Sequence, residues 1–269
     1  MTDFKPIRTP NAVDQVVFVI KISQNISDNH PDTLKSLQQT LKEKFVVSND
    51  ITMNKLEVTP EGMKNQLNIF GGVELRSEIL NQEHKLVGKR ANWQLRISGD
   101  TIQINCFNYT TWTKVSSYVN TLYSDIFQCL ALSNEALITE VVLQYNDTFI
   151  SEEEAESFNV ANLFSKSKFM TENVIEQNSI WHLNSGWFSK IENENSVLNV
   201  LNISTHTISG EKVRYMAKIE HLQKFDVKTK IPISDKTGFI SKMFISLHTE
   251  NKALVSSLLT EEIKEQIGL

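Results

Sequence analysis

Short alternating runs of apolar and polar residues fill the stretch from Ile51 to Asn108, and this pattern constrains the fold more than any other in the chain. A period of two is typical of strands that bury one face and expose the other to water. Between the last two runs, Ser98-Gly99-Asp100 is a favourable sequence for a tight turn. The stretch therefore predicts a meander of antiparallel strands.

Helical periodicity follows the meander and also appears near both ends of the chain. Apolar residues at steps of three and four predict a helix over about 111–132, which we expect to lie across the meander. Similar spacing predicts helices over 31–44 and from about 235, with a short helix after Thr260. Runs rich in β-branched residues predict further strands at 13–22, 137–149, 179–191, 197–208 and 212–225.

These elements predict an α+β protein of mainly antiparallel sheets, each covered by a long helix. A length of 269 residues allows one large domain or two of ordinary size. We expect an N-terminal half at 1–150, a connecting segment at 151–174 and a C-terminal half at 175–269. Both halves place strands before a long helix, so two similar, duplicated halves are an alternative, although no residue-level repeat is visible.

Composition narrows the classes of partner. The net charge of −5 and the isoelectric point of about 5.7 argue against general affinity for duplex nucleic acid or anionic membranes, which clustered Lys and Arg would provide. The start lacks a signal-peptide pattern, and no apolar run approaches the ~20 residues that span a bilayer. We therefore expect a cytoplasmic protein in which Cys106 and Cys129 are reduced thiols.

Common catalytic signatures are absent from the sequence. No serine-hydrolase elbow, P-loop or dinucleotide-binding glycine motif occurs, so no catalytic residue and no cofactor are assigned. No two histidines have the spacing of a helical metal pair. His182, His206 and His221 do fall on three successive predicted strands, which makes a cross-strand metal or enzyme site an alternative to separate surface or core histidines.

Two aromatic segments are candidates for contact surfaces. Cations interleave with a tryptophan along one predicted hairpin, a pattern that suits phosphates and stacked bases, although a solvated face with one core tryptophan would look the same. A second segment combines aromatic and polar groups as a pocket wall or contact surface would, with core packing as the alternative. The nucleic-acid candidates are Lys85, Lys89, Arg90, Trp93 and Arg96, and the pocket candidates are Trp181, His182 and Trp187.

Several short motifs occur along the chain in a fixed order: a Val-Val-Phe-x-Ile opening, a Tyr-x-x-Trp motif before the middle helix, a Leu-x-Tyr strand motif and a Leu-His…Leu-Thr close. They lie at Asn11–Ile20, Tyr109–Trp112, Leu143–Asn146, Leu247-His248 and Thr260–Glu262. In this order they resemble a sporadically distributed family of uncharacterised prokaryotic proteins of about this length. The chain departs from the family at Gln144, where a basic residue is usual, and at Val255, where an aromatic is usual.

The resemblance implies an α+β fold and a cytosolic prokaryotic setting, often beside mobile or defence-related genes, and it transfers no catalytic residue. Our leading hypothesis from the sequence is a non-enzymatic binding or assembly module, for example a subunit of a defence or toxin-regulating complex, with a protein partner or self-association. A nucleic-acid-binding protein that uses the basic hairpin is the second hypothesis. An enzyme with a cross-strand histidine site is the third.

Overall fold

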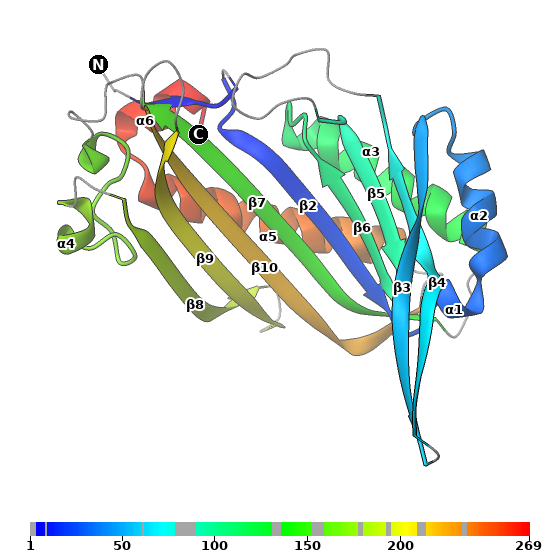
Figure 1. The fold of residues 1–269 in the computed structure, drawn as a ribbon. Coiled ribbons are helices and arrows are strands. Elements are labelled where there is room, and N and C mark those ends of the chain that lie inside the picture. The colour runs from blue at the N-terminus through cyan, green and yellow to red at the C-terminus, as the bar shows by residue number, and fades with distance from the viewer. Residues whose placement is uncertain are drawn as a thin grey trace.

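A single antiparallel sheet organises the protein, which is described here by a computed structural model (Figure 1). The structure describes residues 4–8, 10–60, 62–78, 90–130, 136–151, 159–176, 180–191, 195–208, 214–232 and 236–269. The 10-stranded sheet has the order β3-β4-β5-β6-β2-β7-β10-β9-β8, and β1 also pairs with β7. The predicted α+β class and antiparallel pairing are confirmed.

The elements follow the predicted order closely. Every strand pair in the sheet is antiparallel. The strands are β1 (Phe4–Pro6), β2 (Val13–Ile22), β3 (Val47–Thr59), β4 (Gly62–Arg76), β5 (Trp93–Ser98), β6 (Thr101–Cys106), β7 (Leu137–Ser151), β8 (His182–Ile191), β9 (Asn195–Ile208) and β10 (Arg214–Pro232). The helices are α1 (Ile26–Asn29), α2 (Pro31–Thr40), α3 (Trp112–Leu130), α4 (Glu172–Ile175), α5 (Lys236–Leu258) and α6 (Glu261–Ile267), with a 3-10 turn at Val160–Asn162.

The two predicted halves meet in one sheet and do not form separate sheets. Strand β7 pairs with β2 along one side and with β10 along the other. Backbone hydrogen bonds therefore join strands of the N-terminal half directly to a strand of the C-terminal half. Helix α3 follows the N-terminal strands and α5 follows the C-terminal strands, as the order of elements predicted. The division at 151–174 stays a prediction, and the sheet continues across it.

Helices α3 and α5 lie across one face of the sheet (Figure 1). Phe18 of β2 shows how this face is filled: its ring is 6.0 Å from that of Trp112 on α3 and 5.1 Å from that of Phe244 on α5. Burial of such a side chain contributes roughly 1.5–3 kcal/mol to the stability of the fold.

Among the described residues, no helix is both long enough and apolar enough to cross a membrane.

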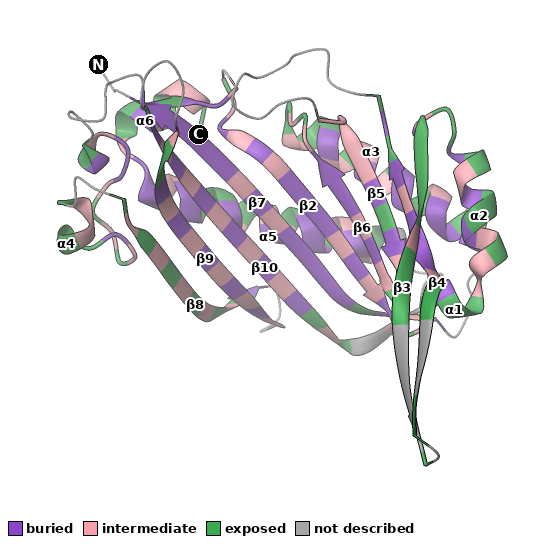
Figure 2. Ribbon diagram, in the orientation of Figure 1, coloured by how far each residue is buried: buried purple, intermediate pink, exposed green. Residues whose placement is uncertain are grey.

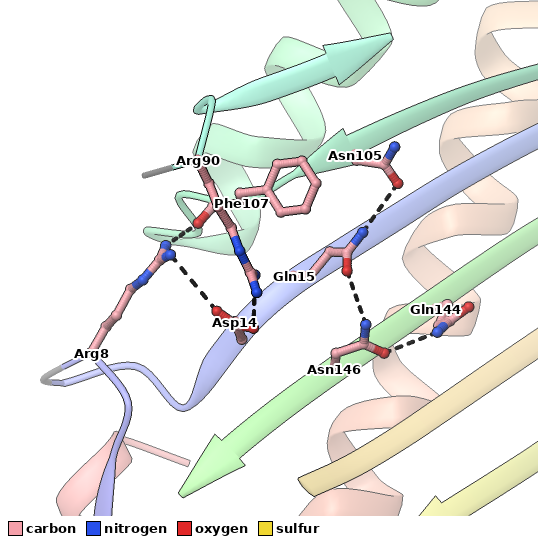
Figure 3. A network of polar contacts seen from close by, with 8 residues as sticks. All are labelled: Arg8, Asp14, Gln15, Arg90, Asn105, Phe107, Gln144 and Asn146. Carbon is pink, nitrogen blue, oxygen red and sulfur yellow. Dashed lines mark hydrogen bonds and ion pairs between the residues drawn. The ribbon is translucent and has the colours of Figure 1, made fainter. Parts of the chain in front are cut away.

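The opposite face of the sheet carries half-buried and exposed residues in alternation with the buried ones (Figure 2). Side-chain amides form a hydrogen-bonded network there. Gln15 of β2 donates to Asn105 of β6 at 3.3 Å and accepts from Asn146 of β7 at 3.1 Å, while Gln144 donates to Asn146 at 2.9 Å (Figure 3). These contacts join three neighbouring strands through polar groups on a face that none of the described helices covers (Figure 1).

Gly72 of β4 gives a direct test of the strand pairing. Its φ of +142° is rarely adopted by residues with a side chain, and an added Cβ would lie 2.0 Å from the Ile97 carbonyl oxygen of β5. We expect Gly72→Ala to lower the free energy of unfolding by about 3 kcal/mol because strain and the backbone clash act together. Urea denaturation would measure this, and Gly238→Ala in α5, where the added Cβ meets no described atom within 4 Å apart from its chain neighbours and its own helix backbone, is the control. Equal stabilities of the two variants would contradict the pairing.

Candidate functional site

A layer of polar side chains interrupts the core between its two apolar clusters. On β10, His221 lies between Ile219 of one cluster and Phe225 of the other. The same interruption occurs on each neighbouring element that faces α5. The interrupting residues are Asn199 on β9, His221 and Gln223 on β10, Tyr145 and Asp147 on β7, and His248 and Asn251 on α5.

His221 holds this layer together between the sheet and α5. Its Nδ1 lies 2.8 Å from Asn251 Oδ1, and its Nε2 lies 3.1 Å from Asn199 Oδ1. Asn199 Nδ2 donates to the carbonyl of Val197 at 3.2 Å, which fixes the orientation of that amide. Burial lowers the pKa of His221 to about 4, so the ring is neutral near pH 7 and carries one N–H to donate to these amide oxygens.

The layer opens into a cavity of about 420 Å³ between β7, α5 and the segment before α3. Five side chains make its chemically distinctive wall. His248 is stacked on Trp112 with 4.0 Å between ring centroids and 9° between planes, and the rings of Tyr109 and Tyr145 meet edge to face at 6.3 Å. Together with Asp147 of β7, these side chains form what we call the aromatic pocket.

Hydrogen bonds fix the orientation of the aromatic wall. The Tyr145 hydroxyl lies 2.8 Å from His248 Nδ1 and is also hydrogen-bonded to the Tyr109 side chain. Burial lowers the pKa of His248 to about 4, with a smaller contribution from the Lys252 charge, so the imidazole is neutral near pH 7. Burial raises the pKa of Tyr109 to about 12 and also raises the pKa of Tyr145 well above its ordinary value, so both phenols keep their protons. The four aromatic side chains of the wall are therefore uncharged and held in place.

Asp147 is the exception in this wall, because it is a carboxyl group in an apolar setting. The residue is only 5% exposed, and burial raises its pKa from 3.8 to about 7. Among the residues that the structure describes, none donates a hydrogen bond to this carboxyl group or forms an ion pair with it. Buried polar groups are nearly always partnered, so an unpartnered carboxyl group that lines a cavity makes this cavity the candidate functional site.

The importance of Asp147 was not visible in any sequence motif, but the alternation of residues along β7 does indicate it. Along β7 the residues that face the helices are Val141, Leu143, Tyr145, Asp147 and Phe149. An acidic residue therefore stands at a core position of an otherwise apolar alternation. Its convergence with α5 and the segment before α3 depends on tertiary packing, which the alternation alone does not specify.

The three candidate histidines do not form one site. His182 and His206 are exposed on the open face, where His206 Nε2 lies 2.8 Å from Ser204 Oγ. His221 is buried on the helix-covered face, because it lies at the opposite phase of strand alternation. Within the described ranges, no group of three or more His, Cys, Asp and Glu residues is placed to hold a metal ion.

The candidate nucleic-acid hairpin also divides between two faces. Arg90 donates to Asp14 at 3.0 Å and its guanidinium lies 5.7 Å from the centre of the Phe107 ring (Figure 3). Trp93 packs on the helix side against Tyr118 at 4.4 Å, whereas Arg96 is exposed on the open face. The remaining candidates, Lys85 and Lys89, lie outside the described residues.

The second aromatic segment is split in the same way. Trp187 faces the core and is stacked over His221 at 5.9 Å with 7° between ring planes, and Trp181 packs against Phe164 at 6.1 Å. His182 points to the open face instead, where it lines a hollow of about 530 Å³ together with Trp181 and His206. Core packing therefore accounts for Trp187, while the other two residues share a shallow surface site.

The raised pKa of Asp147 predicts how the stability of the protein changes with pH. Between about pH 4 and 7 the folded carboxyl group keeps a proton that the unfolded chain has lost, so Asp147 lowers stability as the pH rises. Asn cannot ionise. We expect Asp147→Asn to change stability little near pH 4 and to raise the free energy of unfolding by about 4 kcal/mol above pH 7, from a pKa difference of about 3.

Urea denaturation at pH 4.5 and pH 8 would measure the change. Asp100→Asn, in the exposed turn between β5 and β6, makes the same chemical change and should show no gap between the two pH values. A loss of stability in Asp147→Asn at pH 8 would show that the carboxylate is compensated in the folded protein.

Several residues on which the expected family resemblance rests line the aromatic pocket. Tyr109–Trp112, the strand segment around Tyr145 and His248 all line it, and so does Val255, one of the two departures from the family pattern. The other departure, Gln144, lies on the open face. No protein-family model matches the chain, and no curated protein matches it at a significant level. The resemblance stays a prediction, and the geometry of the pocket carries the functional argument.

Proposed function

We propose that the protein is a binding module that holds a small organic ligand in the aromatic pocket. The observation that carries this proposal is the Asp147 carboxyl group, which is buried, faces the cavity and has no partner among the described residues. A cavity of about 420 Å³ with mostly apolar walls and a few oriented polar groups has the size and character of a small-molecule site.

Stability alone does not account for Asp147. A neutral amide or an aliphatic side chain at this position would avoid the cost of burying a carboxyl group without a partner. Groups that weaken a fold and lie together in a cavity are typical of functional sites, where stability is exchanged for binding. The pocket therefore supports a ligand-binding role better than a purely structural one.

The aromatic wall supports binding to a preformed site. Trp112 is stacked against His248, and Tyr145 is hydrogen-bonded to His248 and Tyr109, so these rings do not need to be ordered when a ligand enters. A preformed site lowers the entropic cost of binding. The defence or toxin-regulating setting remains a hypothesis drawn from the resemblance, and the binding proposal does not depend on it.

A substitution that fills the cavity tests the proposed function. Val255 of α5 is 4% exposed and lines the pocket, so Val255→Phe places an aromatic ring in the space of the ligand. We expect fragments found by ligand-observed NMR with the wild-type protein to bind at least about tenfold more weakly to this variant, which corresponds to about 1.4 kcal/mol.

Ile245→Phe is the matched control, because Ile245 lies on the same helix and is 51% exposed. This control should bind the fragments as the wild type does, and circular dichroism would verify that both variants are folded. Fragments that bind Val255→Phe and the wild type equally well would place their site elsewhere and contradict the proposal.

A further inference from the structure

We infer that the ligand of the aromatic pocket is an organic cation whose ammonium group pairs with the Asp147 carboxylate. This inference rests on the proposed function and names the chemical class of its ligand. Its evidence is the hydrogen-bonding balance of the pocket, the polarity of the wall and the charges around Asp147.

The hydrogen-bonding balance leaves acceptors unfilled inside the pocket. The Tyr145 hydroxyl is bonded to His248 and Tyr109, and the Asn251 side chain faces His221 at 2.8 Å. The two oxygens of Asp147 have no donor among the described residues. A ligand that completes this site must therefore donate hydrogen bonds, and an ionised carboxylate accepts only.

The charge balance favours a cationic donor over a neutral one. A carboxylate in an apolar wall is stabilised most strongly by an opposite charge within hydrogen-bonding distance, and such charge-assisted bonds are about twice as strong as neutral ones. The rings of Tyr109 and Tyr145 next to Asp147 supply apolar contact area and an electrostatic environment that suits alkylated or aromatic ammonium groups.

Of the titratable groups around Asp147, only Asp147 itself is expected to lose a proton when the cation binds. Tyr145 faces it from β7, Tyr109 from the segment before α3, and His248 and Lys252 line the pocket from α5. The tyrosines stay protonated and His248 stays neutral near pH 7, whereas burial raises the pKa of Asp147 to about 7. An ammonium ion binds the ionised carboxylate, so the Asp147 proton leaves to solvent when the ligand enters.

Three aromatic probes that differ in their polar group test the chemical class of the ligand. They are benzylamine, benzyl alcohol and benzoate, each titrated calorimetrically into the full chain. We expect benzylamine to bind at least about tenfold more tightly than the other two and to release close to one proton per ligand at pH 6, read from the dependence on buffer ionisation enthalpy. Its affinity should rise about tenfold per pH unit between pH 5 and 7 and level off above pH 7.

Two variants separate this inference from the proposed function. Asp147→Asn should remove both the preference for the amine and the proton release, while Val255→Phe should weaken every probe. Equal or tighter binding of the alcohol or benzoate, or an amine preference that persists in Asp147→Asn, would overturn the cationic class and leave the pocket as a binding site. If no probe binds the wild type at millimolar concentration, or if Val255→Phe binds them unchanged, both proposals fail.

Discussion

The pairing of β7 with two strands from different parts of the chain is the constraint on which the rest of the structure depends. This strand hydrogen-bonds to β2 on one side and to β10 on the other, so it sets the register of both halves. Because side chains alternate between faces, the two registers also decide which residues of β2 and β10 face α3 and α5. A shift of one residue would move Tyr145 and Asp147 out of the core together.

The polar layer follows from that register and has a cost. Placing His221, Asn199 and Asn251 between two apolar clusters replaces dispersion contacts with hydrogen bonds that must all be satisfied. Two members of the layer do not meet this requirement among the described residues: Gln223, whose buried amide oxygen and nitrogen both lack a partner, and Asp147. Of these two, Asp147 lines the cavity, so its energy would improve if a donor entered there, which links the packing of the protein to its proposed function.

Much of the fold was predictable because it is encoded in local periodicity. The strand at Val13–Ile22 follows from its run of β-branched and other apolar residues, and the helix over Trp112–Leu130 follows from steps of three and four. The candidate site was less accessible. His182, His206 and His221 were grouped because their strands are consecutive, but adjacency of strands does not place residues on the same face, and the odd and even positions separate them.

By itself, the sequence determined the α+β class and the antiparallel strands, because each of these depends on patterns within about twenty residues. Only the tertiary structure decided that the halves share one sheet and that Tyr109, Trp112, Asp147 and His248 meet at one cavity. Such convergence depends on strand order and on the position of α5 across the sheet, which are set by contacts between residues about a hundred positions apart. Local periodicity carries no information about them.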